Sequence, residues 1–380
     1  MFNYIIVGAG FAGSVMAERI SNILDEKVLL IEKRDHIGGN CYDFYDNDGI
    51  LIHKYGPHIF HTNLKKVWDY LSNFTEWTHY EHKVLGYVDG KKVPIPFNLN
   101  TLRQILPDNA DLIEDKLIKT YGYNSKIPIL ELSKTNDKYL KFLSKVVFQK
   151  IFLNYTKKQW GRDPNDLDPS VTNRVPIITS KDNRYFQDKY QGLPKKGYIS
   201  IFHKLLSNSR IHILLNTDFK ELIKLKDKKI YVSGKHFKGK FIFTGSIDEL
   251  FNYKFGNLPY RSLKFKFKKY NQEYYQDVGT INYPNSHDFT RITEYKHLTG
   301  QSNPKTVINI EYPQKYCINQ NIPYYPIPKK EYNLIYKEYE HEAQSIDNLY
   351  LLGRLAEYKY YNMDEVIHRA LKVFEEISSE

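Results

Sequence analysis

The sequence predicts an α/β fold in which a discontinuous Rossmann-like domain carries an inserted helical subdomain and an antiparallel-sheet subdomain. Three observations favour this fold. A strand, a glycine-rich turn and a helix occupy the first residues of the chain. A helical pattern from 99 to about 158 precedes strand-like alternation over 260–312. Finally, the apolar strand 349–352 leads through a glycine into a last helix, which returns the chain to the first sheet.

The first strand, residues 4–7, ends on a turn with G-x-G-x-x-G spacing. Gly8 permits the tight turn, Gly10 lets the backbone approach a pyrophosphate, and Gly13 lets the following helix pack close to the strand. A pyrophosphate would then lie against backbone N–H groups at the positive end of the helix. We therefore expect a bound dinucleotide at this turn.

The second strand, residues 28–31, closes on Glu32. Its carboxylate can accept both hydroxyls of an adenosine ribose, and it disfavours the 2′-phosphate of NADP. The diglycine Gly38-Gly39 follows, and it resembles the flavoprotein variant of the Rossmann fold, in which a second glycine pair lets the chain pass close to FAD. Simple NAD dehydrogenases do not usually show this pair. The predicted cofactor is FAD.

The middle of the chain is expected to add the two other subdomains. Strand-like alternation on both sides of Asp89-Gly90 favours a hairpin. Residues 133–152 carry apolar side chains at helical spacing, and 162–195 is rich in turn residues. We predict an FAD-binding domain of residues 1–80, 196–250 and 340–380, a helical subdomain of 99–158, and an antiparallel-sheet substrate subdomain of 81–98, 159–195 and 251–339.

The composition favours a globular protein of 380 residues, long enough for two or three domains. Mean hydropathy is −0.56, and no apolar run approaches the roughly 18 residues of a membrane span. A core strand at the N-terminus leaves no room for a signal peptide. Cys41 and Cys317 are too few for a disulfide framework and show no metal spacing. We expect a cytoplasmic protein without a metal.

The net charge of +11 raises the question of a polyanionic partner. Basic chains can bind nucleic acid or anionic membranes. Here the lysines are spread along the chain, which indicates a general composition rather than a binding patch. We expect no nucleic-acid partner, because a small polyanionic substrate needs only a few of these charges.

Short segments with distinctive residues follow the FAD turn in a fixed order. They are His36–Asn40, Gly56–Thr62, Tyr155–Trp160, Asn183–Phe186, Thr290–Glu294, Pro323–Ile327 and Gly353–Leu355. In order and spacing, these segments and the turn resemble the bacterial UDP-galactopyranose mutases over the whole length of the chain.

The resemblance implies a reaction in which nucleotide-bound galactose changes between its six-membered and five-membered ring forms, without net redox change. In that family FAD acts in its reduced form. The flavin N5 attacks the anomeric carbon and displaces the nucleoside diphosphate, and the covalent sugar–flavin adduct opens to an iminium. Closure through another hydroxyl and recapture by the diphosphate complete the reaction. We also expect a homodimer that binds a nucleotide sugar.

The resemblance also implies which residues form the site. Arg174 and Arg291 match the two arginines that hold the diphosphate, a task that suits planar guanidinium groups. His58 would lie against the isoalloxazine, and His61 would face the sugar pocket. The substrate-binding candidates are Ile151, Tyr155, Thr156, Trp160, Arg174, Tyr185, Asn282, Arg291, Tyr325 and Tyr360. The cofactor-binding candidates are Gly8, Gly10, Phe11, Gly13, Glu32, Gly38, Gly39, Asn40, Ile59, Arg354, Tyr361, Asn362, Met363, Asp364, Glu365 and Val366.

The sequence departs from the family pattern at three places. Asn362 stands where the family commonly has Asp, Ile151 stands where it usually has Phe, and Ala356-Glu357 replaces a usual Gly-Thr. These changes bear on the substrate more than on the reaction. The same chemistry on another nucleotide sugar, such as dTDP-fucopyranose, is therefore an alternative, because pockets discriminate single groups by only about 1–3 kcal/mol.

Two other classes of protein share some of these features. An FAD amine oxidase or desaturase has the same diglycine turn but needs no diphosphate clamp. The presence of Arg174 and Arg291 therefore argues against this class of enzyme. A noncatalytic binder of sugar nucleotides would not need the full set of flavin residues. Flavin colour, with activity only after reduction by dithionite, separates the mutase from both.

Overall fold

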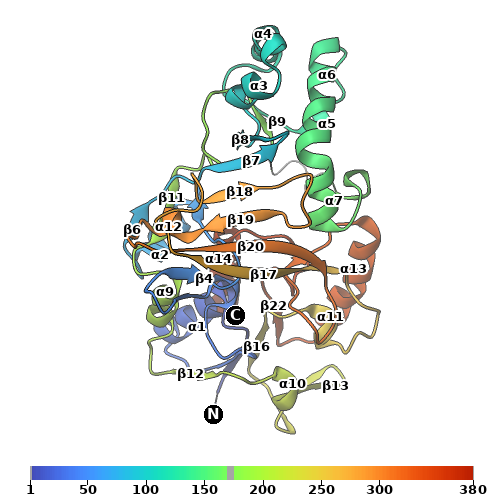
Figure 1. Cartoon of the computed structure of the whole chain (residues 1–380). Helices are drawn as coiled ribbons and strands as arrows, with labels where there is room; N and C mark the ends of the chain where they lie inside the picture. The colour runs from blue at the N-terminus through green and yellow to red at the C-terminus, as the bar shows by residue number, and fades with distance from the viewer. Residues whose placement is uncertain (1, 169–174, 380) are drawn as a thin grey trace.

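A five-stranded parallel sheet forms the lower body of the molecule in the computed structural model, which describes residues 2–168 and 175–379 (Figure 1). Every pairing in it is parallel. The last strand comes from the end of the chain, which confirms the Rossmann-like fold and its discontinuity. In spatial order the strands are β12 (Ile211–Leu214), β2 (Val28–Ile31), β1 (Tyr4–Val7), β16 (Lys240–Phe243) and β22 (Leu349–Leu351).

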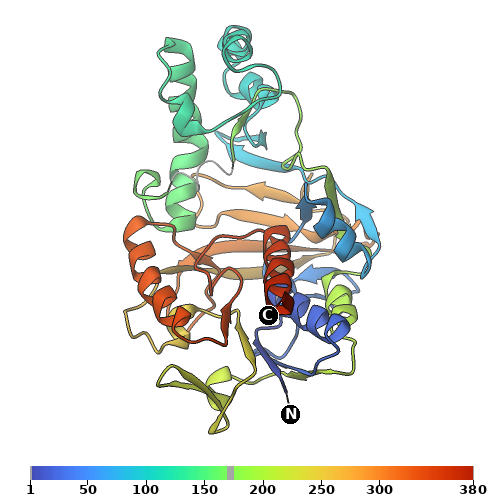
Figure 2. The ribbon, with the colours of Figure 1, turned by 180° about the vertical axis from the view of Figure 1, so that it is seen from behind.

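Both faces of this sheet are covered, which is why its strands are almost continuously apolar. On one face lie α1 (Phe11–Ile23), α9 (Tyr198–Leu205) and α14 (Met363–Ser379), and Figure 2 shows α14 beside α1. Ile6, Leu30 and Ile242 point into this helical layer, and their neighbours along each strand point the other way. That second face is covered by α10 (Phe219–Leu222), α11 (Ile247–Leu250) and the small sheet of β13 (Ile223–Lys226), β14 (Lys229–Val232) and β15 (Lys235–His236).

A seven-stranded sheet lies above the parallel sheet in Figure 1. The hairpin predicted around Asp89-Gly90 is confirmed, and both turn residues have positive φ, of 49° and 78°, as the favoured hairpin turns require. Its strand β7 joins β18 in parallel, and all other pairings are antiparallel. The strand order is β21 (Tyr325–Pro326), β17 (Tyr260–Tyr270), β20 (Thr306–Lys315), β19 (Arg291–Glu294), β18 (Thr280–Asn282), β7 (Val84–Val88) and β8 (Lys91–Ile95).

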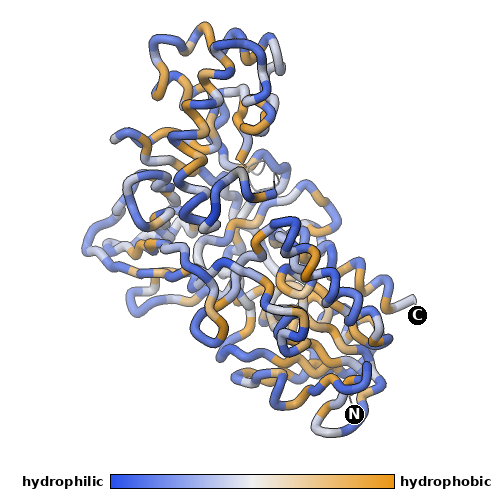
Figure 3. Tube along the Cα trace, turned by 90° about the vertical axis from the view of Figure 1, so that its right-hand side faces the viewer, coloured by the Kyte–Doolittle hydropathy of each residue, from blue (hydrophilic) through white to orange (hydrophobic). Residues whose placement is uncertain are grey.

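A helical projection continues from this sheet and has its own hydrophobic core (Figures 1 and 3). The predicted helix of residues 133–152 begins later, at Lys138, because the side chain of Asp137 accepts the N–H groups of Tyr139 and Leu140 and caps it there. It widens into a π-helical segment, Phe148–Leu153, of a kind often found at functional sites. The helices are α3 (Leu99–Ile105), α4 (Ala110–Tyr121), α5 (Ile129–Leu132), α6 (Lys138–Val147) and α7 (Asn154–Trp160).

Smaller elements connect these bodies. Within the predicted segment 159–195, β10 (Ile177–Ile178) pairs with β9 (Lys126–Ile127), and β11 (Tyr190–Pro194) pairs with β5 (Phe60–Thr62) and β6 (Trp77–His79), rather than with the seven-stranded sheet. The subdomain boundaries stay a prediction. Other elements are the β3 (Asp43–Tyr45) and β4 (Leu51–His53) pair and the helices α2 (Lys65–Ser72), α12 (Tyr295–Thr299) and α13 (Lys330–Gln344).

Asp43 fixes the start of α9, and its loss should weaken the fold. This carboxylate is 1% exposed and accepts the N–H groups of Tyr198 at 2.6 Å and Ile199 at 2.8 Å. Asp43→Ala would leave two helix N–H groups without an acceptor, at a cost of about 1–3 kcal/mol of unfolding free energy. Thermal unfolding measures this, with the exposed Asp69→Ala as control. An unchanged melting temperature for Asp43→Ala would contradict the assignment.

Candidate active site

The glycine turn lies at one end of a pocket of about 240 Å³ at the carboxyl edge of the parallel sheet. Gly8 has a φ of +100°, and a Cβ there would lie 2.1 Å from Oγ1 of Thr244. A Cβ on Gly13 would lie 1.9 Å from the carbonyl oxygen of Gly8. Gly13 therefore requires glycine, because a side chain would force α1 away from β1, and the positive φ of Gly8 favours glycine there.

The predicted second glycine pair completes the wall of this pocket. Gly38 N–H donates to the carbonyl of Ala9 at 2.8 Å. Gly39 has a φ of +55°, and a Cβ there would lie 2.9 Å from Cα of Gly10. The two glycine turns thus touch through backbone alone, which leaves a concave surface suited to a pyrophosphate.

Glu32 closes the far side of the same pocket at the end of β2. One carboxylate oxygen accepts the N–H of Ala9 at 2.9 Å, and the other accepts the N–H of Arg34 at 3.0 Å. A carboxylate has about four acceptor positions, so each oxygen keeps capacity for a ribose hydroxyl. The geometry fits the role predicted for Glu32.

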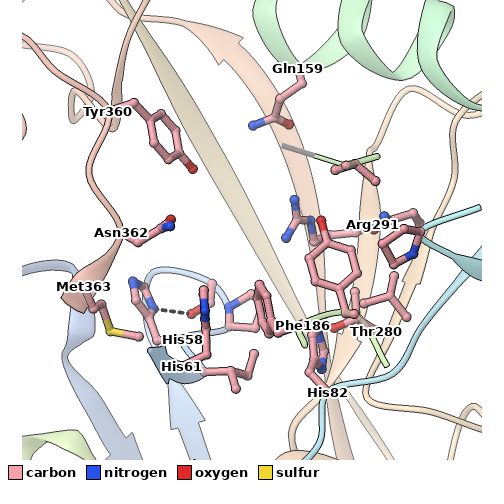
Figure 4. A pocket seen from close by; sticks show the side chains of 18 of the residues that line it. His58, His61, His82, Gln159, Phe186, Thr280, Arg291, Tyr360, Asn362 and Met363 are labelled. Atoms are coloured by element: carbon pink, nitrogen blue, oxygen red, sulfur yellow. Dashed lines mark hydrogen bonds between the residues drawn. The ribbon is translucent and has the colours of Figure 1, made fainter. Parts of the chain in front are cut away.

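A larger cavity of about 680 Å³ opens above this pocket, between the parallel sheet and the seven-stranded sheet. Figure 4 shows polar side chains entering it from the first third of the chain, from α7, from β19 and from the segment before α14. Six residues line both spaces, so the pocket and the cavity meet at them. They are Asn40, His58, Tyr324, Arg354, Asn362 and Met363.

Arg291 is the cation on the sheet side of the cavity. Its Nη2 donates to the hydroxyl of Tyr155 at 2.8 Å, and its Nε lies 3.4 Å from Oε1 of Glu311, the residue opposite it in the sheet. Burial alone lowers the pKa of Arg291, but the charges of Glu311 and nearby tyrosines outweigh it and raise that pKa well above its usual value. Burial raises the pKa of Glu311, and Arg291 opposes that shift. Arg291 is therefore fully charged and faces the cavity.

The two predicted histidines occupy different parts of the cavity wall. Nδ1 of His58 lies 2.9 Å from the carbonyl oxygen of Gly56, which can accept a hydrogen bond but cannot donate one. Burial lowers the pKa of His58 to about 4, so the ring is neutral and carries its hydrogen on Nδ1. His61 makes a 2.9 Å contact with Asp188 and stacks on Phe186 at 3.6 Å between ring centroids. His58 lies at the junction with the cofactor pocket, and His61 does not.

A third space, of about 90 Å³, extends the cavity toward the helical projection. Its lining is mostly apolar and includes aromatic side chains, which suits a nucleobase. Five residues line both it and the large cavity: Tyr155, Trp160, Val175, Tyr185 and Asn282. Its inner wall includes Ile151, Phe152 and Thr156.

Tyr325 and Tyr360 form a stacked pair on the opposite wall. Their ring centroids lie 5.3 Å apart with an interplanar angle of 11°. The guanidinium of Arg354 lies over both rings, at 5.2 Å and 4.8 Å, and donates to the carbonyl of Tyr361. Three of the predicted residues are thus joined in one cation–aromatic cluster, of which Arg354 lies at the junction.

Sequence comparison identifies the family to which this site belongs. A family model described as "UDP-galactopyranose mutase" matches residues 150–360, and one described as "NAD(P)-binding Rossmann-like domain" matches residues 6–74. The chain is 36% identical to the UDP-galactopyranose mutase of Mycoplasma genitalium, over 100% of this chain and 95% of that protein. The chain belongs to the UDP-galactopyranose mutase family. It is also 33% identical to the dTDP-fucopyranose mutase of Escherichia coli, over 98% of this chain and 97% of that protein.

The fold agrees with solved structures. A crystal structure of reduced UDP-galactopyranose mutase matches with a TM-score of 0.74 and 16% identity, over 100% of this chain and 94% of that one. A putative protoporphyrinogen oxidase from Exiguobacterium matches with a TM-score of 0.63 and 15% identity, over 99% of this chain and 98% of that one. Mutases and oxidases thus share the fold, and sequence places this chain with the mutases.

Membership of the UDP-galactopyranose mutase family carries FAD as the cofactor, and the smaller pocket fits that group. Gly8, Gly10, Gly38 and Gly39 supply its close backbone walls, and Glu32 lines it where its carboxylate could accept ribose hydroxyls. Among residues 2–168 and 175–379, no helix has the length and hydropathy of a membrane span.

The structure brings most of the predicted site residues together around these three connected spaces. Arg174 falls outside the described residues. Gly13 lines none of the spaces and acts through packing. Ile59, Asp364 and Glu365 line the large cavity rather than the smaller pocket, whereas Phe11, Tyr361 and Val366 line the pocket.

Several residues of the site were missed by sequence reasoning. Arg34 lines the cofactor pocket, and its Nη1 is buried without a hydrogen-bond partner among the described residues. Its position between Glu32 and the diglycine could have indicated that it lines the cofactor pocket. Glu311, Asp188 and His82 line the large cavity, and none of them stands in a motif. They are brought there by strand pairing and by contacts over long sequence separations.

Glu32→Ala should lose flavin. The change removes the carboxylate that faces the pocket and also two acceptors that hold the turn, and the unpaired groups are costly in a buried site. We expect the purified variant to contain little FAD, measured by the absorbance of released flavin against protein. The control is Glu26→Ala, a half-buried acid on the same unit that accepts from Asn3 and does not line the pocket. Full flavin occupancy in Glu32→Ala would contradict this assignment.

Proposed function

We propose that this protein interconverts UDP-galactopyranose and UDP-galactofuranose, and that the three connected spaces hold FAD, the sugar diphosphate and the base in that order. The observation that carries the proposal is the junction at which the cofactor pocket opens into the large cavity. A flavin ring in the smaller pocket and a sugar in the large cavity would meet at this junction. When bound, reduced FAD supplies the nucleophile for the anomeric carbon.

The residues of the chain would hold the reactants and the departing charge. Arg291 would bind the diphosphate as it leaves, because its guanidinium is fixed by Tyr155 and Glu311 and needs no reorganisation. Tyr325 and Tyr360 would donate to the phosphates from the opposite wall. Tyr155, Tyr185 and Trp160 would hold the nucleoside between aromatic faces.

His58, as a neutral ring at the junction, would pack on the isoalloxazine without adding positive charge to it. His61, positioned by Asp188, would contact the sugar. We also propose Arg174 as the second diphosphate arginine, on the family resemblance alone. Catalysis then depends on holding the diphosphate both as leaving group and as returning nucleophile.

We propose that the protein is a homodimer and that it is located in the cytoplasm. Large apolar side chains on the helical projection support a partner surface, with Leu112 at 42%, Tyr123 at 62% and Phe142 at 45% exposure. Cys41 and Cys317 are free thiols, as a reducing compartment requires.

A second substrate is favoured by a specific comparison. The chain is nearly as similar to a dTDP-fucopyranose mutase as to UDP-galactopyranose mutases. Thymine in place of uracil adds one methyl group, and the small pocket presents the aliphatic Ile151 and Ile95 at its wall. dTDP-fucopyranose is therefore the alternative substrate.

Conversion should require reduced flavin. We expect oxidised enzyme to bind UDP but leave the sugar unchanged. Dithionite-reduced enzyme should convert one member of a nucleotide-sugar panel, and chromatography measures the conversion. UDP-galactofuranose and dTDP-fucofuranose as starting compounds distinguish the two substrates. Equal turnover with and without reductant would contradict the mutase chemistry.

Removal of either arginine should slow turnover. Arg291→Ala should cost about 2–4 kcal/mol of barrier, or roughly 10²–10³ in rate, because a charge-assisted donor to the leaving group is lost. Arg291→Lys keeps the charge, and with it the pairing of buried Glu311, but loses the planar fork, so it should recover part of the rate. Arg174→Ala should behave similarly.

Rates of the reduced variants are compared at equal flavin content, with Arg210→Ala, an exposed ion-paired arginine, as control. Near-normal turnover in Arg174→Ala and Arg291→Ala would place the diphosphate contacts elsewhere.

A further inference from the structure

Lys158 joins two separate parts of the nucleotide end of the cavity. It lies on α7, and its Nζ donates to three backbone carbonyls of the loop between β18 and β19: those of Tyr283, His287 at 2.9 Å and Phe289 at 3.0 Å. An ammonium group has three hydrogens and no acceptor. All three are therefore used on this one loop, and the side chain points away from the substrate spaces.

Lys158 joins α7 to the β18–β19 hairpin, and these two parts carry the proposed substrate-binding side chains on both sides of the base pocket. From α7 come Tyr155 and Trp160, and the hairpin supplies Asn282 and Arg291, which lie opposite each other in the sheet. The loop that Lys158 holds begins directly after Asn282 and ends one residue before Arg291. The loop carbonyls are neutral acceptors. A charged donor on α7 binds them more strongly than a neutral donor would.

Further hydrogen bonds also attach the β18–β19 loop to its surroundings and hold α7 in place. Asn285 of the loop donates to the carbonyl of Lys150, and Asn154 donates to Asn285. On the far side, Arg261 of β17 donates to the carbonyls of Lys158 and Gln159 at the end of α7. The helix is thus held from both sides, and Lys158 makes the only three-bonded side-chain contact with the loop among the described residues.

We infer that Lys158 is a positioning residue for the nucleotide: its ammonium group clamps the β18–β19 loop to α7 and so sets the width of the base pocket. This inference rests on the proposed function, because it takes a nucleoside diphosphate as the occupant. Lys158 touches neither the substrate nor the cofactor pocket, and it acts through Asn282 and Arg291 on one side and Tyr155 on the other.

The surroundings of Lys158 make the clamp sensitive to pH. Burial lowers its pKa to about 8, and the charge of Asp288 partly opposes that shift. On its own helix, Lys157 is paired with Asp163. From β17, Arg261 donates to the backbone carbonyl of Lys158 on the other side of α7, and Tyr87 of β7 packs on Tyr283 and His287 of the loop. The ammonium is therefore charged at neutral pH and loses its proton above the pKa, which weakens its bonds to the carbonyls.

The experiment is calorimetric titration of the oxidised holoenzyme with UDP, and with dTDP in parallel, at pH 7 and pH 9.5. Lys158→Met should weaken binding roughly 10-fold or more at pH 7, because three carbonyls lose a charged donor. Flavin content should be unchanged, since the FAD pocket is built from other elements. Wild-type affinity should fall from pH 7 to pH 9.5.

Two variants separate positioning from a general structural role. Lys158→Arg keeps its charge at both values of pH, so its affinity should change less with pH than that of the wild type. Lys157→Met is the matched control, because this neighbouring lysine on the same helix pairs with Asp163 near the surface, and it should bind UDP as the wild type does. Titration of the nucleotide itself is common to all four proteins.

The outcomes are distinct. If the wild-type protein binds neither UDP nor dTDP, the proposed function fails. If the wild type and Lys158→Met bind the nucleotide equally well, the inferred role of Lys158 as a clamp is wrong. If Lys158→Met does not fold, Lys158→Arg decides: the same fall in affinity as the wild type between the two pH values would overturn the inference.

Discussion

The contact of α1 with the strand before it, through glycine alone, is the constraint on which the rest of the structure depends. With no side chain at Gly13, the helix lies directly against the carbonyl of Gly8, and with none at Gly39, the second turn lies against Gly10. The position of α1 then fixes α9 and α14, which pack on it. The N-terminal end of α14 supplies Met363 at the junction, so backbone packing at one turn determines where the smaller pocket opens into the large cavity.

The second organising feature is the pair of charges in the seven-stranded sheet. Arg291 and Glu311 face each other across β19 and β20, and neither Nε of Arg291 nor Oε1 of Glu311 has a hydrogen-bond partner among the described residues. A buried carboxylate without full pairing is costly, and such a cost is expected where a site must hold a cation in one place. The carboxylate keeps Arg291 charged and aimed, and the hydroxyl of Tyr155 fixes its other end.

Sequence alone predicted the parts of the site that depend on local spacing. The glycine turns, Glu32 and the Asp89-Gly90 hairpin follow from rules that act within a few residues, and the structure has them where they were expected. Asp188 and Glu311 were not predicted, because their roles come from pairing across the fold: His61 and Asp188 are 127 residues apart, and Arg291 meets Glu311 only through strand register. The start of α6 at Lys138 was missed because the cap at Asp137 overrides the apolar periodicity before it. The proposed roles of Tyr325 and Tyr360 come from the family resemblance, because no periodicity indicates them.

The charge balance in the cavity supports the proposal of a second diphosphate arginine. Glu311 offsets much of the charge of Arg291, and Arg354 is occupied by the carbonyls of Tyr361 and Tyr324 and by two tyrosine rings. A nucleoside diphosphate that leaves a sugar gains negative charge, and Arg291 paired with Glu311 cannot neutralise all of it. Either another cation must enter, for which Arg174 is the proposed group, or Glu311 must take up a proton as the phosphate arrives. The raised pKa of Glu311 favours that uptake, and a bound diphosphate that also attracts Arg291 would raise it further.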